Sequence, residues 1–327
     1  MARKVWIDNL RGLCMMAILL DHTELYYTGI NIIDYNVYVV NALVLFFILS
    51  GYLMYKESYF SFKQKLHSIL STLVMPYFIF TTLIAIPKIL IHSHKLNMTD
   101  TFIGIITGQA SWFVAALIVA ELLFSIVIKI GKGKSTLLFP ISFLGFIVSI
   151  ILSTKTQPYI WQIDNAMQAL LFLCMGYTYH MYESYFKCLE RVPYMIILLI
   201  LLVTIKFYEN INHINMLIWN IDINNYPVFL LDITICSIFL ITLFKRLPSG
   251  KLLAWTGRHS LVYYFLCGGI PMIIATLLNH IGFVYRGNYL YVVATFVLVY
   301  IVSSLITYAI YQYIPIITGH KEEKKEQ

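Results

Sequence analysis

The sequence predicts an all-α, polytopic integral membrane protein with about ten transmembrane helices and with both termini in the cytoplasm. Of its 327 residues, 60% are hydrophobic and only 12% are charged, and the mean hydropathy of +0.77 exceeds that of soluble globular domains. The apolar residues form runs of roughly 20, the length that crosses a bilayer as a helix. The basic residues are also concentrated on alternate loops, as the positive-inside rule requires.

The first apolar run follows a basic N-terminal segment, contains charged residues and lacks a small-residue cleavage site. We therefore expect a permanent helix and not a signal peptide. Residues 1–319 are expected to form one transmembrane domain, followed by a charged cytoplasmic tail at residues 320–327. The ten expected spans lie near Leu10–Thr28, Val37–Tyr55, Ile69–Ile91, Ser111–Ile128, Thr136–Ser153, Asn165–Met181, Val192–Phe207, Tyr226–Phe244, Ser260–Leu278 and Tyr289–Tyr313.

The positions of the lysines and arginines support this count. With a cytoplasmic N-terminus, most of the 23 fall in the cytoplasmic loops and tails. The five on the other side are Lys88, Lys95, Lys155, Lys206 and Arg286. A missed or extra span would mix the two groups. Because the basic residues occur in small clusters between apolar runs, they predict a topology and membrane-lipid contacts, and not nucleic-acid binding.

The first expected span contains ionisable residues, which are costly at membrane depth and usually face a cavity or a partner. Among them, His22 could remove a proton from a hydroxyl group, because imidazole titrates near neutral pH. Asp21 and Glu24 are carboxylates close to it. Neighbouring residues on a helix point about 100° apart, so we do not expect Asp21 to bond His22 directly. The alternative role for His22 is polar packing between helices.

Arg11 lies eleven residues before His22, which places the two about 16 Å apart along a helix and on nearly the same face. Arg11 would suit a phosphate group. It is equally compatible with a cytoplasmic topology anchor.

Other polar residues occur at span ends or within spans. Glu121 is a second ionisable group at membrane depth. Trp112 opens its span and could be an interfacial anchor. Ser50 precedes Gly51 in a helix where small residues permit close packing. Arg258 and Ser260 open the ninth span, where helix amides and a guanidinium would suit an anion, although Ser260 could simply cap the helix. No cluster with metal-ligand spacing is present in the sequence, and we expect no metal.

Taken in order, several motifs resemble those of the membrane-bound acyltransferase 3 family. Arg11 and His22 match a basic residue followed, after ten residues, by histidine. The remaining matches are Phe46–Tyr52 with a Phe-Phe-x-x-Ser-Gly-aromatic run, Trp112–Leu117 with Trp-Phe-x-x-Ala-Leu, Phe172–Tyr177 with Phe-x-x-x-Gly-Tyr, and Gly257–Ser260 with Gly-x-x-Ser. Many relatives carry a histidine ten residues after the glycine of this last motif. In this chain that glycine is Gly257, and the position holds Cys267.

The resemblance implies an inner-membrane O-acyltransferase that uses cytoplasmic acetyl-CoA. Its expected acceptor is a hydroxyl of an envelope polysaccharide, exopolysaccharide or lipid-linked glycan. We expect His22 as general base with Glu121 and Asp21 as further catalytic residues. Arg11, Arg258 and Ser260 are expected to bind the donor, and Glu24, Trp112 and Ser50 to contact the acceptor.

Two other functions fit the same residues. A secondary transporter or flippase would also place buried charges along a substrate path, although no internal repeat supports this class. A sensor or scaffold without catalysis would leave His22 and Arg11 dispensable. The sequence does not indicate the oligomeric state.

Overall fold

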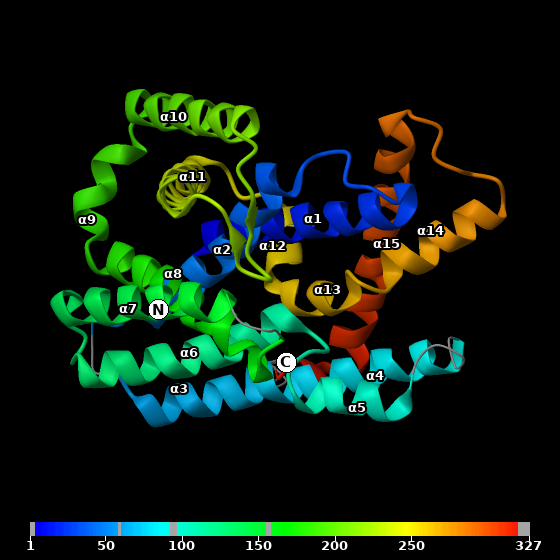
Figure 1. The fold of residues 1–327 in the computed structure, drawn as a ribbon, viewed down its shortest axis with the longest axis horizontal. Coiled ribbons are helices and arrows are strands. Elements are labelled where there is room, and N and C mark those ends of the chain that lie inside the picture. Colours follow the sequence, from blue (N-terminus) through cyan, green and yellow to red (C-terminus); the bar gives the residue numbers. More distant parts are fainter. Residues whose placement is uncertain (1–3, 58–59, 92–96, 155–157, 320–327) are drawn as a thin grey trace, which may run out of the picture. The chain divides into compact units, whose positions relative to one another are not determined.

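The computed structural model describes residues 4–57, 60–91, 97–154 and 158–319, and its regular structure is predominantly helical (Figure 1). The predicted all-α class is confirmed. The expected tail at residues 320–327 lies outside the described residues.

Helices form at all ten expected spans. They are α1 (Val5–Thr28), α2 (Tyr35–Met54), α4 (Met75–Ile91), α6 (Trp112–Ile130), α7 (Ser135–Ser153), α8 (Ile163–Met181), α10 (Val192–Ile211), α11 (Tyr226–Arg246), α13 (Ser260–Leu266) with α14 (Ile270–His280), and α15 (Tyr289–Tyr313). The other elements are α3 (Phe62–Ile69), a π-helical turn at Leu70–Val74, α5 (Met98–Ile106), α9 (Glu183–Phe186), α12 (Lys251–Arg258), short 3₁₀ turns, and the strands β1 (Met216–Leu217) and β2 (Asp222–Ile223).

Seven helices in the described chain are long and apolar enough to cross a membrane, so the chain is a multi-pass membrane protein. They are α2, the helix Phe62–Ala85, α6, α7, α10, α11 and α15. The pair α13 and α14 would be an eighth span, bent by 47°. The helices α1 and α8 have 24 and 19 residues, but their sequences are more polar.

The described chain divides into two compact units. Unit 1 contains the residues up to Phe46, Tyr182–Ile218 and Asp222–Tyr308. Unit 2 contains Phe47–Met181, Trp219–Ile221 and the residues from Ala309 on. The chain passes from one unit to the other within α2, after α8, on both sides of Trp219–Ile221, and within α15.

In unit 1, α1 packs most extensively against α12, and a pair of glycines makes this contact possible (Figure 1). A β-carbon on Gly12 would overlap the carbonyl of Leu253, and one on Gly257 would overlap the carbonyl of Asp8. The two backbones therefore touch directly. This contact brings the junction of α12 and α13 to the first turns of α1.

In unit 2, α8 packs against α6 and α7, and a second glycine pair joins it to α2. A β-carbon on Gly51 would overlap the carbonyl of Leu173, and one on Gly176 would overlap that of Ile48. The glycines of two sequence motifs, Phe46–Tyr52 and Phe172–Tyr177, therefore form the contact between α2 and α8.

The carboxyl-terminal end of α1 is set by Gly29, which adopts a left-handed conformation with φ of 80° and donates its N–H to the carbonyl of Leu25. Glycine adopts this conformation without the steric cost of a β-carbon. The chain then turns into a short loop, residues 29–34, before α2 begins at Tyr35.

Candidate functional site

Arg11 is held by residues far away in the sequence. Its Nη2 donates a hydrogen bond to the hydroxyl of Ser260 at 3.0 Å, and its guanidinium lies 5.9 Å from the ring centroid of Phe46. Ser260 is buried at the start of α13, where the close contact between α1 and α12 places it. Three of the motifs found in the sequence therefore meet at one arginine.

Arg258 joins the same cluster through an ion pair. Its Nε lies 3.4 Å from a carboxylate oxygen of Asp8, whose side chain is 7% exposed, whereas that of Arg258 is 45% exposed. Asp8 thereby places a second guanidinium next to Arg11 and Ser260. The structure brings together the three residues expected to bind the donor, and their role in binding stays a prediction.

His22 is one of two residues of α1, the other being Asn9, with a buried polar atom that lacks a hydrogen-bond partner in the described chain. Its Nδ1 is buried and has no hydrogen-bond partner in the described part of the chain. Its ring stacks on Tyr26, with 6.2 Å between centroids and 18° between planes. A buried polar atom without a partner costs about 1–3 kcal/mol, so such atoms are usually completed by water or a ligand.

Asp21 and Glu24 fasten the loop that follows α1. The Asn31 amide donates to Asp21 at 2.6 Å, and the backbone N–H of Ile33 donates to Glu24 at 3.2 Å. Neither carboxylate orients the imidazole through Nδ1, because that nitrogen has no partner in the described chain. This agrees with the expected geometry of adjacent helical residues.

Tyr35 and Tyr38, which the sequence analysis did not identify, extend the polar surroundings of α1. Their hydroxyl oxygens are buried without hydrogen-bond partners among the described residues. Both side chains lie within electrostatic range of the Asp21 carboxylate. Tyrosines are so frequent at span ends that the sequence offered no signal to single these two out.

Cys267 lies at the break between α13 and α14. It is buried, and its thiol donates to the carbonyl of Tyr264 at 2.9 Å. Cys267 is also an electrostatic neighbour of Tyr26, the residue that stacks on His22. The position where many relatives carry histidine is therefore close to the surroundings of His22.

The remaining predicted site residues belong to unit 2. Glu121 is buried and pairs with the Lys65 ammonium at 2.7 Å. Trp112 is half-buried, with its ring 5.6 Å from that of Phe113 in an edge-on arrangement. Ser50 is half-buried beside Gly51. The roles of Glu121, Trp112 and Ser50 in catalysis and acceptor binding stay predictions.

Unit 2 also contains a pocket of about 520 Å³ with a basic lining. Lys56, Lys129 and Lys132 line it together with the single acid Glu57. Lys132 adopts a left-handed backbone with φ of 49°, followed by Gly133 with φ of 72°, so a tight turn forms one wall. The excess positive charge would suit an anion.

A buried ion cluster in unit 1 was missed in the sequence. Lys206 pairs with Asp232 at 2.9 Å and with Glu209 at 3.1 Å, and Asn41 donates to Asp232 at 2.8 Å. Asp232 lies within an apolar run, so its ionisable side chain at membrane depth was a usable signal.

The sequence matches the family described as "Acyltransferase domain" over residues 4–308. The chain belongs to the acyltransferase 3 family. Searches of curated proteins and of solved structures each found no match. The family match includes α1 with His22 and Arg11, and also the junction of α12 and α13, so both parts of the candidate site lie within the acyltransferase domain.

Proposed function

We propose that this acyltransferase 3 protein transfers an acetyl group from cytoplasmic acetyl-CoA to a sugar hydroxyl. The acceptor would be an envelope polysaccharide, an exopolysaccharide or a lipid-linked glycan. The observation that carries the proposal is His22, whose buried Nδ1 has no partner among the described residues of an acyltransferase domain. Such a nitrogen is available to a reacting group.

In the proposed reaction His22 acts as general base. It takes the proton of the acceptor hydroxyl while the oxygen attacks the thioester carbonyl. The carbon–sulfur bond then breaks, and the imidazolium returns the proton to the leaving coenzyme A thiolate. A relay through an acyl-enzyme would require a second nucleophile. Cys14 lies on the first helix, but it is buried and suits packing better.

The donor carries several phosphate groups, which guanidinium and ammonium groups recognise. The cluster of Arg11, Arg258 and Ser260 supports donor binding near the start of α1. In unit 2, the basic pocket around Lys132 offers another surface for the same anionic groups. Comparing Lys132→Ala with Lys134→Ala, whose lysine does not line the pocket, tests this second surface through the KM for acetyl-CoA.

We infer ten spans and cytoplasmic termini. The bent pair of α13 and α14 and the two more polar helices α1 and α8 would bring the seven apolar helices to ten. Helix α1 can be polar because its charged residues have partners within the protein. With the basic residues facing the cytoplasm, the protein would lie in the cytoplasmic membrane of a bacterium.

The proposal is tested by supplying membranes that contain the protein with labelled acetyl-CoA and un-acetylated envelope glycan. An acyltransferase incorporates label into the glycan and releases free coenzyme A in equal amount. A transporter or flippase would change the sidedness of the glycan without consuming acetyl-CoA, and that result would contradict the proposal.

A further inference from the structure

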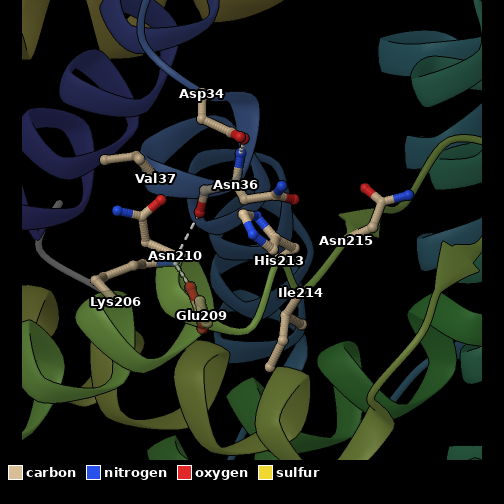
Figure 2. A pocket seen from close by; sticks show the side chains of 9 residues that line it. All are labelled: Asp34, Asn36, Val37, Lys206, Glu209, Asn210, His213, Ile214 and Asn215. Atoms are coloured by element: carbon tan, nitrogen blue, oxygen red, sulfur yellow. Dashed lines mark hydrogen bonds and ion pairs between the residues drawn. The ribbon is translucent and has the colours of Figure 1, made fainter.

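A polar pocket of about 280 Å³ lies in unit 1 where α10 ends and α2 begins (Figure 2). Its lining comes from three segments: the last residue of the loop after α1 with the first turn of α2, the last two turns of α10, and the chain that leads to β1. The polar residues of the lining include Asp34, Asn36, Lys206, Glu209, Asn210 and His213. None of them has a place in the proposed catalytic machinery.

The floor of this pocket is part of the buried ion cluster. The Lys206 ammonium donates to the carbonyl of Asn36 at 2.7 Å and to the carboxylates of Asp232 and Glu209. All three hydrogens of the ammonium are thus used. The cation is consequently engaged by the protein and is not available to an anionic ligand.

Glu209 lines the pocket and has an unused acceptor atom. The residue is only 4% exposed, and Oε2 accepts from Lys206, but Oε1 has no hydrogen-bond partner in the described chain. The pocket lining and the cluster together contain three carboxylates, those of Asp34, Glu209 and Asp232, and the one ammonium of Lys206. The pocket is therefore negative and requires a hydrogen-bond donor from its ligand.

The wall opposite the cluster is fixed in position. His213 has a left-handed backbone with φ of 47°, an unusual conformation for a residue with a β-carbon. The backbone N–H of Ile214 donates to the carbonyl of Glu209 at 3.0 Å, and that of Met216 donates to the side chain of Asn36 at 2.9 Å. Strained backbone that is held by surrounding bonds is typical of binding sites.

We propose that this pocket binds a neutral sugar unit of the acceptor glycan, whose hydroxyl groups donate to Glu209 and exchange hydrogen bonds with Asn210 and His213. The inference rests on the proposed function. Hydroxyl groups donate and accept, and this matches a lining of one free carboxylate oxygen, an amide and an imidazole. The negative charge disfavours uronic acids and phosphates. No group of three potential metal ligands occurs in the described residues.

The pocket is connected to the surroundings of His22. Asp34 ends the loop that Asp21 and Glu24 fasten to α1. His22 lies six residues before the end of α1 at Thr28, about 9 Å along the axis. In the proposed topology Lys206 also belongs to the side opposite the cytoplasm, where an envelope glycan is found.

The test is direct binding without acetyl-CoA. The probe is a fluorescent, end-labelled neutral oligosaccharide released from the envelope glycan of cells lacking this protein, and binding is measured to the purified full-length protein in nanodiscs. Asn210→Ala is compared with Asn212→Ala, because Asn212 is exposed two residues further on and does not line the pocket. Glu209→Gln removes the charge while keeping the shape of the side chain.

We expect Glu209→Gln to raise the Kd about tenfold, because its side chain is buried, and Asn210→Ala to raise it about two- to tenfold, because its side chain is exposed. Asn212→Ala should leave the Kd unchanged. Equal Kd values for Asn210→Ala, Asn212→Ala and the wild type would overturn the proposal, even if Glu209→Gln fails to fold. Absence of wild-type binding both to this oligosaccharide and to the lipid-linked precursor of the second arm would overturn it as well.

A second arm uses the lipid-linked precursor of the same glycan in nanodiscs. Pocket-dependent binding of the free oligosaccharide assigns the site to the polymer, and pocket-dependent binding of the precursor alone assigns it to the lipid-linked form. Because no acyl transfer is measured, failure of the acetyltransferase assay with intact pocket-dependent binding would reject the proposed function and leave the sugar site standing.

Discussion

At the scale of single residues, α1 combines charged side chains that have partners with two buried polar atoms that have none in the described chain, Asn9 Oδ1 and His22 Nδ1. Asp8, Arg11, Asp21 and Glu24 each have a hydrogen bond or ion pair to a residue outside their own helix. His22 has a buried Nδ1 without one in the described chain. Of these two atoms, the imidazole nitrogen of His22 can accept and return a proton near neutral pH, whereas the amide oxygen of Asn9 cannot, which is consistent with a reaction at His22.

The bond between Arg11 and Ser260 is expected to stabilise the contact of α1 with α13. Ser260→Ala removes the acceptor of a charged, partly buried donor, and we expect the free energy of unfolding to fall by about 1–3 kcal/mol. Ser303→Ala is the matched control, because its buried hydroxyl oxygen has no partner in the described residues. Thermal unfolding in detergent measures both. Equal effects of the two substitutions would contradict a stabilising Arg11–Ser260 bond.

Glu121 can be a catalytic group or only the counter-ion of Lys65. Removing one partner of a buried pair leaves an uncompensated charge, so we expect Lys65→Met alone to be more destabilising, by about 3 kcal/mol, than Lys65→Met combined with Glu121→Gln. The transfer activity of the double variant decides the role of Glu121. Retained activity assigns it to structure, and lost activity in a folded double variant supports the predicted catalytic role.

The sequence identified polar residues where their type was unusual for its surroundings. Arg11 and His22 stood out in an apolar run, and Ser260 was recognised from its place at a helix start. Asn41 and Asp232 were missed although they occupy apolar runs, because their partners lie in other helices: Asn41 of α2 donates to Asp232 of α11, and Asp232 pairs with Lys206 of α10. Spacing along one helix does not report such pairing between helices.

At the scale of secondary-structure elements, the two glycine pairs set how closely helices approach. We expect Gly257→Ala to destabilise the protein by about 1–3 kcal/mol or more, because its β-carbon would overlap the backbone carbonyl of Asp8, which cannot move freely. Gly104→Ala in α5 points into open space and should be neutral or stabilising by up to about 1 kcal/mol. Similar unfolding temperatures for the two variants would refute the close contact of α1 and α12.

Helix positions followed closely from hydropathy, but the shape of the ninth span did not. The expected single helix Ser260–Leu278 breaks between α13 and α14, with a bend of 47°. Gly268, Gly269 and Pro271 lie at the break, and these residues weaken or cannot continue the helical hydrogen-bond ladder. The strands β1 and β2 have two residues each and are too short for periodicity to indicate.

At the scale of the whole molecule, the proposed topology places the loop at Cys188 in the cytoplasm and the end of α10 on the other side. Cys188 is the exposed cysteine of the described chain. In intact spheroplasts a membrane-impermeant maleimide should label Asn212→Cys in a Cys188→Ser background and should label native Cys188 only after the membrane is opened. Labelling of Cys188 in intact spheroplasts would show that the orientation is inverted.

The most direct test of His22 as the general base compares the wild type, His22→Ala and His280→Ala at matched expression. The measured quantity is acetyl transfer to un-acetylated envelope glycan. His280 is an exposed histidine at the end of α14 and controls for the loss of an imidazole elsewhere. Loss of a general base typically lowers the rate about 10²–10⁴-fold, so we expect His22→Ala to fall by that factor while remaining folded and His280→Ala to match the wild type. Full activity in folded His22→Ala would contradict the assignment of His22 as the base.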